Sequence, residues 1–310
     1  MNLIRHFVLL ATLQLGTLSA SAQSIPPTLA EFEVQRALQY AEHDGSKITG
    51  DLYTPKAPGK YPALVAVHGG AFKVGNARSY QYWGPYLAQR GYVVLSVDYR
   101  LVTPDGKNKY PAAIHDVRAA VQFLRSRGES LKVDPERIGL MGDSAGAYLS
   151  AIVALAGDKA PFAGAYKSDS FSAVSTKVKV CIGVYGVYDR AAAWEHEQIN
   201  RGDKAFERFM GAPLPDNRRL YFEASPLSYA TRDNNKTAFL LAWGTEDDID
   251  DPETQSKVFV RALKQAEFPP VRTVILQGAP HFWMSDPIDE PQSHTGFLAP
   301  RLVRFLQSQL

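Results

Sequence analysis

The chain has 310 residues, of which 45% are hydrophobic and 21% are charged, a composition typical of a globular protein with a full core. Its 34 Lys and Arg residues nearly balance 32 Asp and Glu residues, so the charge gives no reason to expect nucleic acid or an anionic membrane as a partner. We therefore do not expect a polyanion as partner, and the expected partner is a small molecule. The length fits a single domain, because α/β architectures routinely reach it without splitting.

The N-terminus has the pattern of a secretory signal peptide. Arg5 precedes an apolar stretch over residues 7–11, and small residues follow up to Ala22. The pattern predicts cleavage after Ala22, so residues 1–22 would be removed and residues 23–310 would form one domain of a secreted or periplasmic protein. The alternative, an uncleaved anchor, requires roughly 20 apolar residues, and this run is shorter. We expect no membrane span elsewhere.

The remaining chain predicts an α/β fold. From Glu33 to Pro55 two strands meet at Asp44-Gly45, a dipeptide typical of a hairpin turn. Short apolar runs then alternate with helical periodicities, which indicates a mostly parallel sheet with an antiparallel N-terminal hairpin and helices on both faces. Further strands are predicted near residues 63–67, 92–97, 138–141, 178–184, 238–243 and 271–276. Helices are predicted near residues 111–127, 145–156, 252–266 and 294–309.

One segment interrupts this alternation. Residues 190–236 are polar and aromatic, contain several Gly and Pro residues, and lie between two predicted strands. A connection of this length inside a compact domain is usually functional, so we predict a lid-like insertion that forms a pocket wall. The alternative is an excursion with no role in the site.

The strongest motif is G-x-S-x-G at residues 142–146, which follows an apolar strand and precedes a helix. This order is typical of a nucleophile elbow, in which a serine sits on a sharp turn at the carboxyl edge of the sheet. Such a turn accepts only small neighbours, and Gly142, Ala145 and Gly146 meet that requirement. Ser144 is therefore the predicted nucleophile.

A second motif, His68-Gly69-Gly70-Ala71-Phe72, follows an earlier apolar strand. Acyl transfer requires backbone N–H donors that face the oxyanion, and glycines allow the backbone to approach the substrate closely. We predict an oxyanion hole formed by the amides of Gly70, Ala71 and Ala145, with His68 as a structural brace.

Together these motifs resemble those of the hormone-sensitive-lipase-like α/β-hydrolases and the related acetyl and feruloyl esterases. That group pairs an H-G-G-G loop with G-D-S-A-G at the elbow; here Ala71 replaces the third glycine and keeps its N–H. The segment Asp98-Tyr99-Arg100-Leu101 is similar to the D-Y-R-L of the group, and Ser225-Pro226-Leu227 to its S-P-L. The resemblance runs from about residue 37 to the end, and it implies an α/β-hydrolase fold rather than a particular substrate.

The chain order of this fold, serine then acid then histidine, predicts the other two members of a triad. The resemblance places the acid at Asp247, after the strand at 238–243, while Glu246, Asp248 and Asp251 remain alternatives. His281 follows the last predicted strand and is the expected general base. The nearby rival, His294, is placed at the start of the terminal helix.

The resulting hypothesis is a serine carboxylesterase that acts on short-chain or aromatic esters through an acyl-enzyme. Phe72, Tyr185, Tyr188 and Trp283 are candidate pocket residues, although each is also an ordinary packing residue. Two alternatives stay open: an amide or arylformamide hydrolase of the same fold, and a ligand-binding relative without catalysis. No motif suggests a metal or nucleotide site, so we expect no cofactor.

Overall fold

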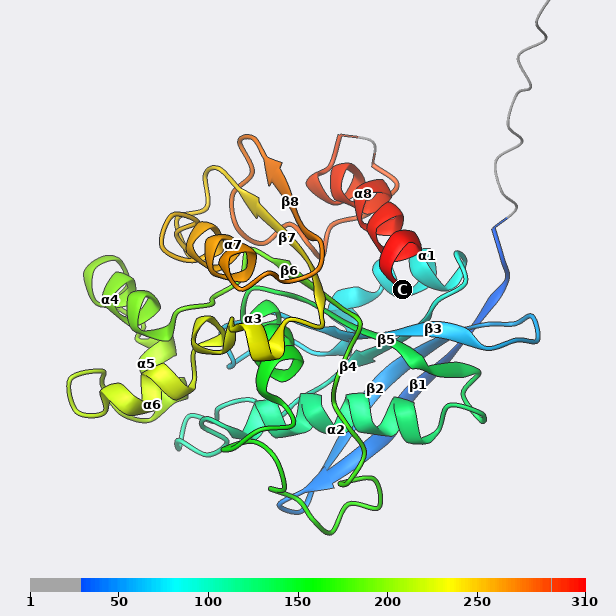
Figure 1. Cartoon of the computed structure of the whole chain (residues 1–310), viewed down its shortest axis with the longest axis horizontal. Coiled ribbons are helices and arrows are strands. Elements are labelled where there is room, and N and C mark those ends of the chain that lie inside the picture. Colours follow the sequence, from blue (N-terminus) through cyan, green and yellow to red (C-terminus); the bar gives the residue numbers. More distant parts are fainter. Residues whose placement is uncertain (1–28, 291) are drawn as a thin grey trace, which may run out of the picture.

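The structure is a computed structural model that describes residues 29–290 and 292–310, and its centre is one eight-stranded sheet (Figure 1). The predicted signal peptide, residues 1–22, lies outside the described residues. The strands are β1 (Phe32–His43), β2 (Ser46–Pro55), β3 (Tyr61–Val67), β4 (Val93–Val97), β5 (Val133–Asp143), β6 (Val180–Val184), β7 (Ala238–Gly244) and β8 (Val271–Leu276).

The sheet has the order β1-β2-β4-β3-β5-β6-β7-β8. The β1–β2 and β2–β4 pairs are antiparallel, and every later pair is parallel. The predicted hairpin is confirmed, and its turn contains Asp44 and Gly45, both with positive φ. Because β3 and β5 to β8 run in one direction, the loops after them meet at one edge of the sheet, where open α/β sheets bind ligands.

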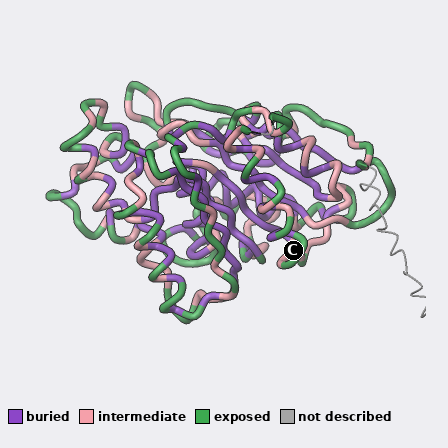
Figure 2. Tube along the Cα trace, turned by 90° about the horizontal axis from the view of Figure 1, so that it is seen from above, coloured by how far each residue is buried: buried purple, intermediate pink, exposed green. Residues whose placement is uncertain are grey.

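Helices cover both faces of the sheet, as predicted. On one face α2 (Ala112–Ser126), α3 (Ala145–Ala156) and α7 (Ser256–Gln265) pack on the strands, and on the other face α1 (Trp83–Ala88) and α8 (His294–Gln309) do so. The tube in Figure 2 shows the consequence, with buried residues along the middle layer and exposed residues on the outer loops. The predicted α/β-hydrolase architecture is therefore confirmed.

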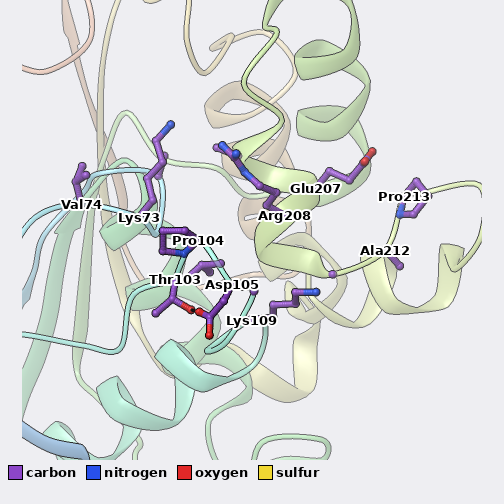
Figure 3. A pocket seen from close by; sticks show the side chains of 15 residues that line it. Lys73, Val74, Thr103, Pro104, Asp105, Lys109, Glu207, Arg208, Ala212 and Pro213 are labelled. Atoms are coloured by element: carbon purple, nitrogen blue, oxygen red, sulfur yellow. Dashed lines mark hydrogen bonds between the residues drawn. The ribbon is translucent and has the colours of Figure 1, made fainter.

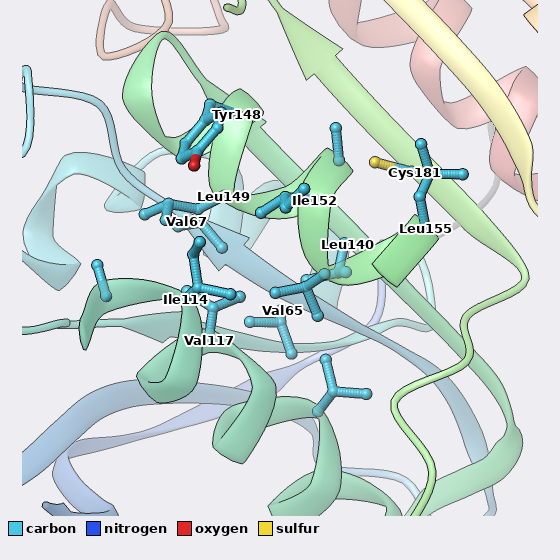
Figure 4. Packing of buried hydrophobic residues seen from close by; sticks show 14 of the residues in the cluster. Val65, Val67, Ile114, Val117, Leu140, Tyr148, Leu149, Ile152, Leu155 and Cys181 are labelled. Carbon is cyan, nitrogen blue, oxygen red and sulfur yellow. The ribbon is translucent and has the colours of Figure 1, made fainter. Parts of the chain in front are cut away.

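Helix α3, which follows the elbow, is buried along almost its whole length. Leu149 and Ile152 have no exposed surface, and they pack towards Ile114 and Val117 of α2 and Leu140 of β5 (Figure 4). A helix that is apolar on nearly all sides has to lie inside the protein. The first turn of α3 is thus fixed between the sheet and α2, and it cannot shift without opening the core.

The segment between β6 and β7 contains three short helices and two 3-10 turns. The helices are α4 (Arg190–Asn200), α5 (Ala205–Met210) and α6 (Arg218–Glu223), and the turns are η2 (Pro226–Tyr229) and η3 (Arg232–Asn234). They project beyond the carboxyl end of β6 (Figure 1). We refer to residues 190–236 as the insert.

Among the described residues, no helix combines the length and apolar character that a membrane crossing requires.

Candidate active site

Ser144 stands on a strained turn between β5 and α3. Its φ of 51° and ψ of −120° lie in a region that a residue with a side chain rarely adopts. The flanking glycines make the turn possible: a Cβ on Gly142 would lie 2.3 Å from the carbonyl oxygen of Gly146, and one on Gly146 would lie 1.9 Å from that of Val67. The amide of Ser144 donates to the carbonyl of Val184 over 2.9 Å. The predicted elbow geometry is present, and Ser144 is 7% exposed.

The loop after β3 brings amides to the same place. Gly70, Ala71 and Phe72 all have positive φ, at 109°, 52° and 63°. Turn conformations of this kind occur in nests, where successive backbone N–H groups bind an anion. Within the described part of the chain, the amides of Gly70, Ala71 and Ala145 donate no hydrogen bond. All three are therefore free for an oxyanion.

A buried carboxyl joins this loop to the elbow. Asp143 accepts from the amide of Gly69 at 3.2 Å and from the hydroxyl of Tyr80 at 3.0 Å. Burial raises the pKa of Asp143 to about 6, although Tyr80 and the charge of His281 act in the opposite direction. Ser144 and the amide-bearing loop are thus held to each other by the side chain of the residue that precedes the serine.

His68 has the structural position expected for it. Burial lowers the pKa of His68 to about 4, which leaves the ring neutral. Its Nδ1 lies 2.6 Å from the carbonyl oxygen of Gly69, and its ring stacks on Tyr99 at 4.3 Å. The side chain therefore braces the loop through Gly69 and Tyr99.

The structure pairs His281 with Asp247. Nδ1 of His281 lies 2.8 Å from Oδ2 of Asp247, and the two side chains are 1% and 0% exposed. His281 is on the loop after β8 and Asp247 on the loop after β7, which are neighbouring strands. Of the alternatives, Glu246 and Asp248 are exposed, and His294 is the first residue of α8.

His281 keeps its second nitrogen free. Nε2 is buried and has no hydrogen-bond partner among the described residues, Ser144 included. The ring of His281 lies 4.4 Å from the ring of Tyr185. Tyr185 directly follows Val184, whose carbonyl accepts the hydrogen bond from the amide of Ser144. Burial by itself lowers the pKa of His281, but the bond to Asp247 and the charge of Asp250 outweigh burial and raise it above 6.5.

Asp250 is a site residue that sequence reasoning missed. Its Oδ2 lies 3.9 Å from Nε2 of His281, the side chain is 2% exposed, and this oxygen has no hydrogen-bond partner among the described residues. Burial raises the pKa of Asp250 to about 6. Oδ1 of Asp247 accepts from the amides of Ile249 and Asp250, each over 3.1 Å, and so fixes the turn that directs Asp250 inward.

The four candidate pocket aromatics are all buried, on two faces of the sheet. Phe72 and Tyr188 belong to the core under α2, α3 and α7, while Tyr185 and Trp283 belong to the core under α1 and α8. Tyr188 stacks on Phe259 of α7 at 4.3 Å. Of the four, Tyr185 contacts the imidazole of His281, and its hydroxyl accepts from the amide of Met284.

The insert packs directly on the elbow helix and on the loop after β3. Phe209 of α5 stacks on Phe72 with ring centres 3.8 Å apart. Arg190, which has no exposed surface, places its guanidinium carbon 5.0 Å from the ring centre of Tyr148 and 4.9 Å from that of Phe206. These cation–π contacts offset part of the cost of burying the charge. The insert is therefore packed against both α3 and the amide-bearing loop.

A cavity of about 700 Å³ opens between the insert and two sheet-edge loops. Figure 3 shows Lys73 and Val74 of the amide-bearing loop and Thr103 to Asp105 of the loop after β4 on one side, with Glu207 and Arg208 of α5 on the other. Ala71 also lines the cavity. The cavity thus begins at one of the free amides.

Among the described residues, no group of three or more His, Cys, Asp or Glu side chains has a geometry that could hold a metal ion.

Comparison with known proteins adds family information to this geometry. Residues 51–263 match the family described as BD-FAE. The esterase LipQ of Mycobacterium tuberculosis is 32% identical over 232 residues, which cover 73% of this chain and 51% of LipQ. The probable carboxylic ester hydrolase LipM of the same organism is 27% identical over 69% of this chain and 47% of its own length. The chain therefore spans about half the length of these curated relatives.

Solved structures share the fold over nearly their full length. An esterase from Thermogutta terrifontis, in a propionate-bound structure, has a TM-score of 0.70 at 21% identity and covers 91% of this chain and 94% of its own. A truncated carbohydrate esterase from gut microbiota has a TM-score of 0.72 at 19% identity, with 91% and 98% covered.

Proposed function

Since this chain belongs to the BD-FAE family, we propose that it is a serine carboxylesterase that hydrolyses short-chain or aromatic esters through an acyl-enzyme on Ser144. The observation that carries the proposal is the buried hydrogen bond between Nδ1 of His281 and Asp247. This bond leaves Nε2 of His281 without a partner among the described residues, at the edge of the sheet where Ser144 stands on its strained turn. The names of the curated relatives, esterase and carboxylic ester hydrolase, support an ester as substrate.

In the proposed acylation, the hydroxyl of Ser144 attacks the ester carbonyl and His281 takes its proton at Nε2. Asp247 holds the ring by Nδ1 and stabilises the imidazolium that forms. The amides of Gly70, Ala71 and Ala145 bind the oxyanion, and each such donor typically contributes about 3 kcal/mol to the transition state. His281 then returns the proton to the leaving alcohol.

Two features of the site match this chemistry. The imidazole is fully buried against Tyr185, so its bond to Asp247 acts in a low-dielectric environment where it is strong. The first turn of α3 starts at Ala145, so the positive end of the helix faces the developing negative charge. Both effects favour the tetrahedral intermediate over the bound ester.

Replacement of the nucleophile tests the proposal. Ser144→Ala should leave the thermal melting curve unchanged or slightly raised, because the strained residue contributes no hydroxyl hydrogen bond, and should remove nearly all turnover of p-nitrophenyl acetate. A fluorophosphonate probe should label the wild type and not the variant, since labelling requires an activated serine. Wild-type turnover in the variant would disprove the proposal, and absence of labelling in the wild type would favour a non-catalytic binding protein.

A panel of substrates then distinguishes an ester hydrolase from an amide hydrolase. We expect acetyl and feruloyl esters to be cleaved faster than a formanilide of similar size. The cavity between Ala71 and Arg208 offers room for an aromatic acyl group, which supports feruloyl or similar esters. Faster cleavage of the formanilide would instead identify an amide hydrolase.

We also propose that the insert, residues 190–236, acts as a lid over this cavity, and that the chain is exported with cleavage after Ala22. N-terminal sequencing of the protein recovered from outside the cytoplasm tests the second point; an N-terminus at Met1 would contradict it.

A further inference from the structure

Two buried polar atoms of the candidate site lie close to each other. They are Nε2 of His281 and Oδ2 of Asp250, which lie 3.9 Å apart. Both are enclosed, and neither has a hydrogen-bond partner among the described residues. Buried polar atoms are nearly always satisfied, so a pair that is not indicates a place for a polar ligand. A ligand placed between the two atoms lies within hydrogen-bonding distance of both.

The spacing of the two atoms fits one small molecule. An oxygen placed at about 2.8 Å from both atoms would see them at an angle of about 90°, close to the angle between the two O–H bonds of water. A water molecule in this position would donate one proton to Nε2 and the other to Oδ2. Its lone pairs would then point away from both atoms, so that one of them is available to attack an acyl carbon.

We propose that Asp250 is a catalytic residue that holds the hydrolytic water of deacylation between itself and His281. This rests on the proposed function, because it assigns a residue to the second half of that reaction. In the proposal the imidazole of His281 acts in both half-reactions. Acylation uses His281 and Ser144, whereas hydrolysis of the acyl-enzyme also uses Asp250.

The step balances as follows. The water oxygen forms a bond to the acyl carbon as His281 takes one water proton at Nε2. The tetrahedral intermediate then expels Oγ of Ser144, which receives that proton from Nε2. The second water hydrogen stays on the product acid, hydrogen-bonded to Asp250 until the acid ionises and leaves. No other reactant is required.

The charges around Asp250 suit an acceptor. Burial raises its pKa, the positive charges of His281, Arg201 and Arg190 lower it, and Asp247 raises it, so that the pKa lies at about 6. Above that pH the carboxylate accepts the hydrogen bond from water. As His281 becomes positive during attack, Asp250 also stabilises the imidazolium from the side opposite Asp247.

Competition between water and methanol tests the proposal. Methanol has a single O–H, which His281 uses, so its attack does not depend on Asp250. With p-nitrophenyl butyrate in aqueous methanol, Asp250→Asn should raise the ratio of methyl butyrate to butyrate by about 10-fold. Acyl-enzyme on Ser144 should accumulate, visible by mass spectrometry after an acid quench. The ratio does not depend on how much of the enzyme is folded.

Asp248→Asn is the matched control, since Asp248 is in the same acidic loop but exposed, and it should leave the ratio unchanged. Asp250→Ala, which keeps no acceptor, should raise the ratio at least as much as Asp250→Asn. An unchanged ratio in both Asp250 variants would overturn the proposal while leaving the esterase function intact. A parallel loss of both products together with fluorophosphonate labelling would also overturn it, because Asp250 would then act before deacylation. Failure of the proposed function itself would show instead as turnover by Ser144→Ala.

Discussion

Two buried histidines in this molecule each bond an aspartate, yet their surroundings differ in one respect. Nδ1 of His43 lies 2.6 Å from Asp116, and its Nε2 lies 3.0 Å from Asp169. His281 has the same contact to Asp247 at 2.8 Å, but its Nε2 has no partner among the described residues. Both ring nitrogens of His43 are therefore paired, and the side chain holds the N-terminal hairpin to α2 and to the loop after α3.

The difference shows what marks a reactive histidine. A short bond to a carboxylate is present in both pairs, so it does not distinguish them. Asp116 is also bound by Arg100 through its side chain and amide, so that both carboxylate oxygens of Asp116 accept hydrogen bonds. In the pair of His281 and Asp247, Nε2 of the imidazole has no hydrogen-bond partner among the described residues. This nitrogen is therefore available to accept and release a proton.

The largest expected effect is on activity, and it follows from removing Nε2 of His281. His281→Ala should lower kcat/KM for p-nitrophenyl acetate by roughly 1,000- to 100,000-fold, because proton transfer from Ser144 is lost. His43→Asn measured in the same assay should keep a near wild-type rate per folded molecule. A similar loss in both variants would show that the two pairs do not differ in the way proposed.

The second effect is on stability, and here we expect the larger loss in the His43 variant rather than in the His281 variant. His43→Asn should reduce the free energy of unfolding by about 3 kcal/mol, since it leaves two carboxylates without their buried cation. Burial lowers the pKa of His43, but its bonds to Asp116 and Asp169 outweigh burial and raise it. The stabilisation is therefore complete below the unfolded value of 6.5 and is lost as pH rises through the higher folded pKa. Urea unfolding at pH 5.5 and 8.5 should show the larger difference at pH 5.5.

A third expectation concerns the unpaired carboxyl of the site. The pKa of Asp250 is raised to about 6 from 3.8, so its ionised form destabilises the folded state above pH 6, and this cost disappears as pH falls towards 4. Asp250→Asn should raise the free energy of unfolding at pH 8 by about 2 to 3 kcal/mol, with little change at pH 4. A lower melting temperature of the variant at pH 8 would contradict it.

The smallest effect is a displacement of the pH profile. The base form of His281 is required, so kcat/KM should rise with pH through a pKa above the ordinary 6.5. Asp250→Asn removes a negative charge that helps to raise this pKa, and the acidic limb should move to lower pH by a fraction of a unit. An unmoved limb in steady-state profiles of both proteins would show that Asp250 does not interact with the imidazole.

Much of the fold could be predicted because strands and helices have local signatures. Buried strands such as β4, Val93–Val97, are short runs of β-branched and aliphatic residues, and the apolar face of α2 repeats at helical spacing. The start of α7 was predicted near Pro252, but the helix begins at Ser256. Hydrogen bonds of Gln255 to the backbone of Tyr188 and Asp189 hold the preceding residues outside the helix, and such long-range contacts leave no local pattern.

The site residues that could be predicted are those whose positions follow from chain order and from the strained turn at the elbow. Ser144, Asp247 and His281 each follow a predicted strand, so topology alone brings them to one edge of the sheet. Asp250 was not predictable, because it lies in a run of acidic residues that look alike in sequence. In the structure, Asp247 and Asp250 are buried while Asp248 is exposed. A turn closed by the carboxylate of Asp247 produces that spacing.

The contact between Gly146 and the end of β3 limits how the proposed esterase could change its range of substrates. A methyl group there would overlap the carbonyl oxygen of Val67, the residue from which the amide-bearing loop departs. Any side chain at this position would push the nucleophile away from its own anion-binding groups. Mutations at the elbow therefore cannot enlarge the site. Mutations in α5 can, because Arg208 lines the cavity and can be replaced without moving Ser144 or the amides.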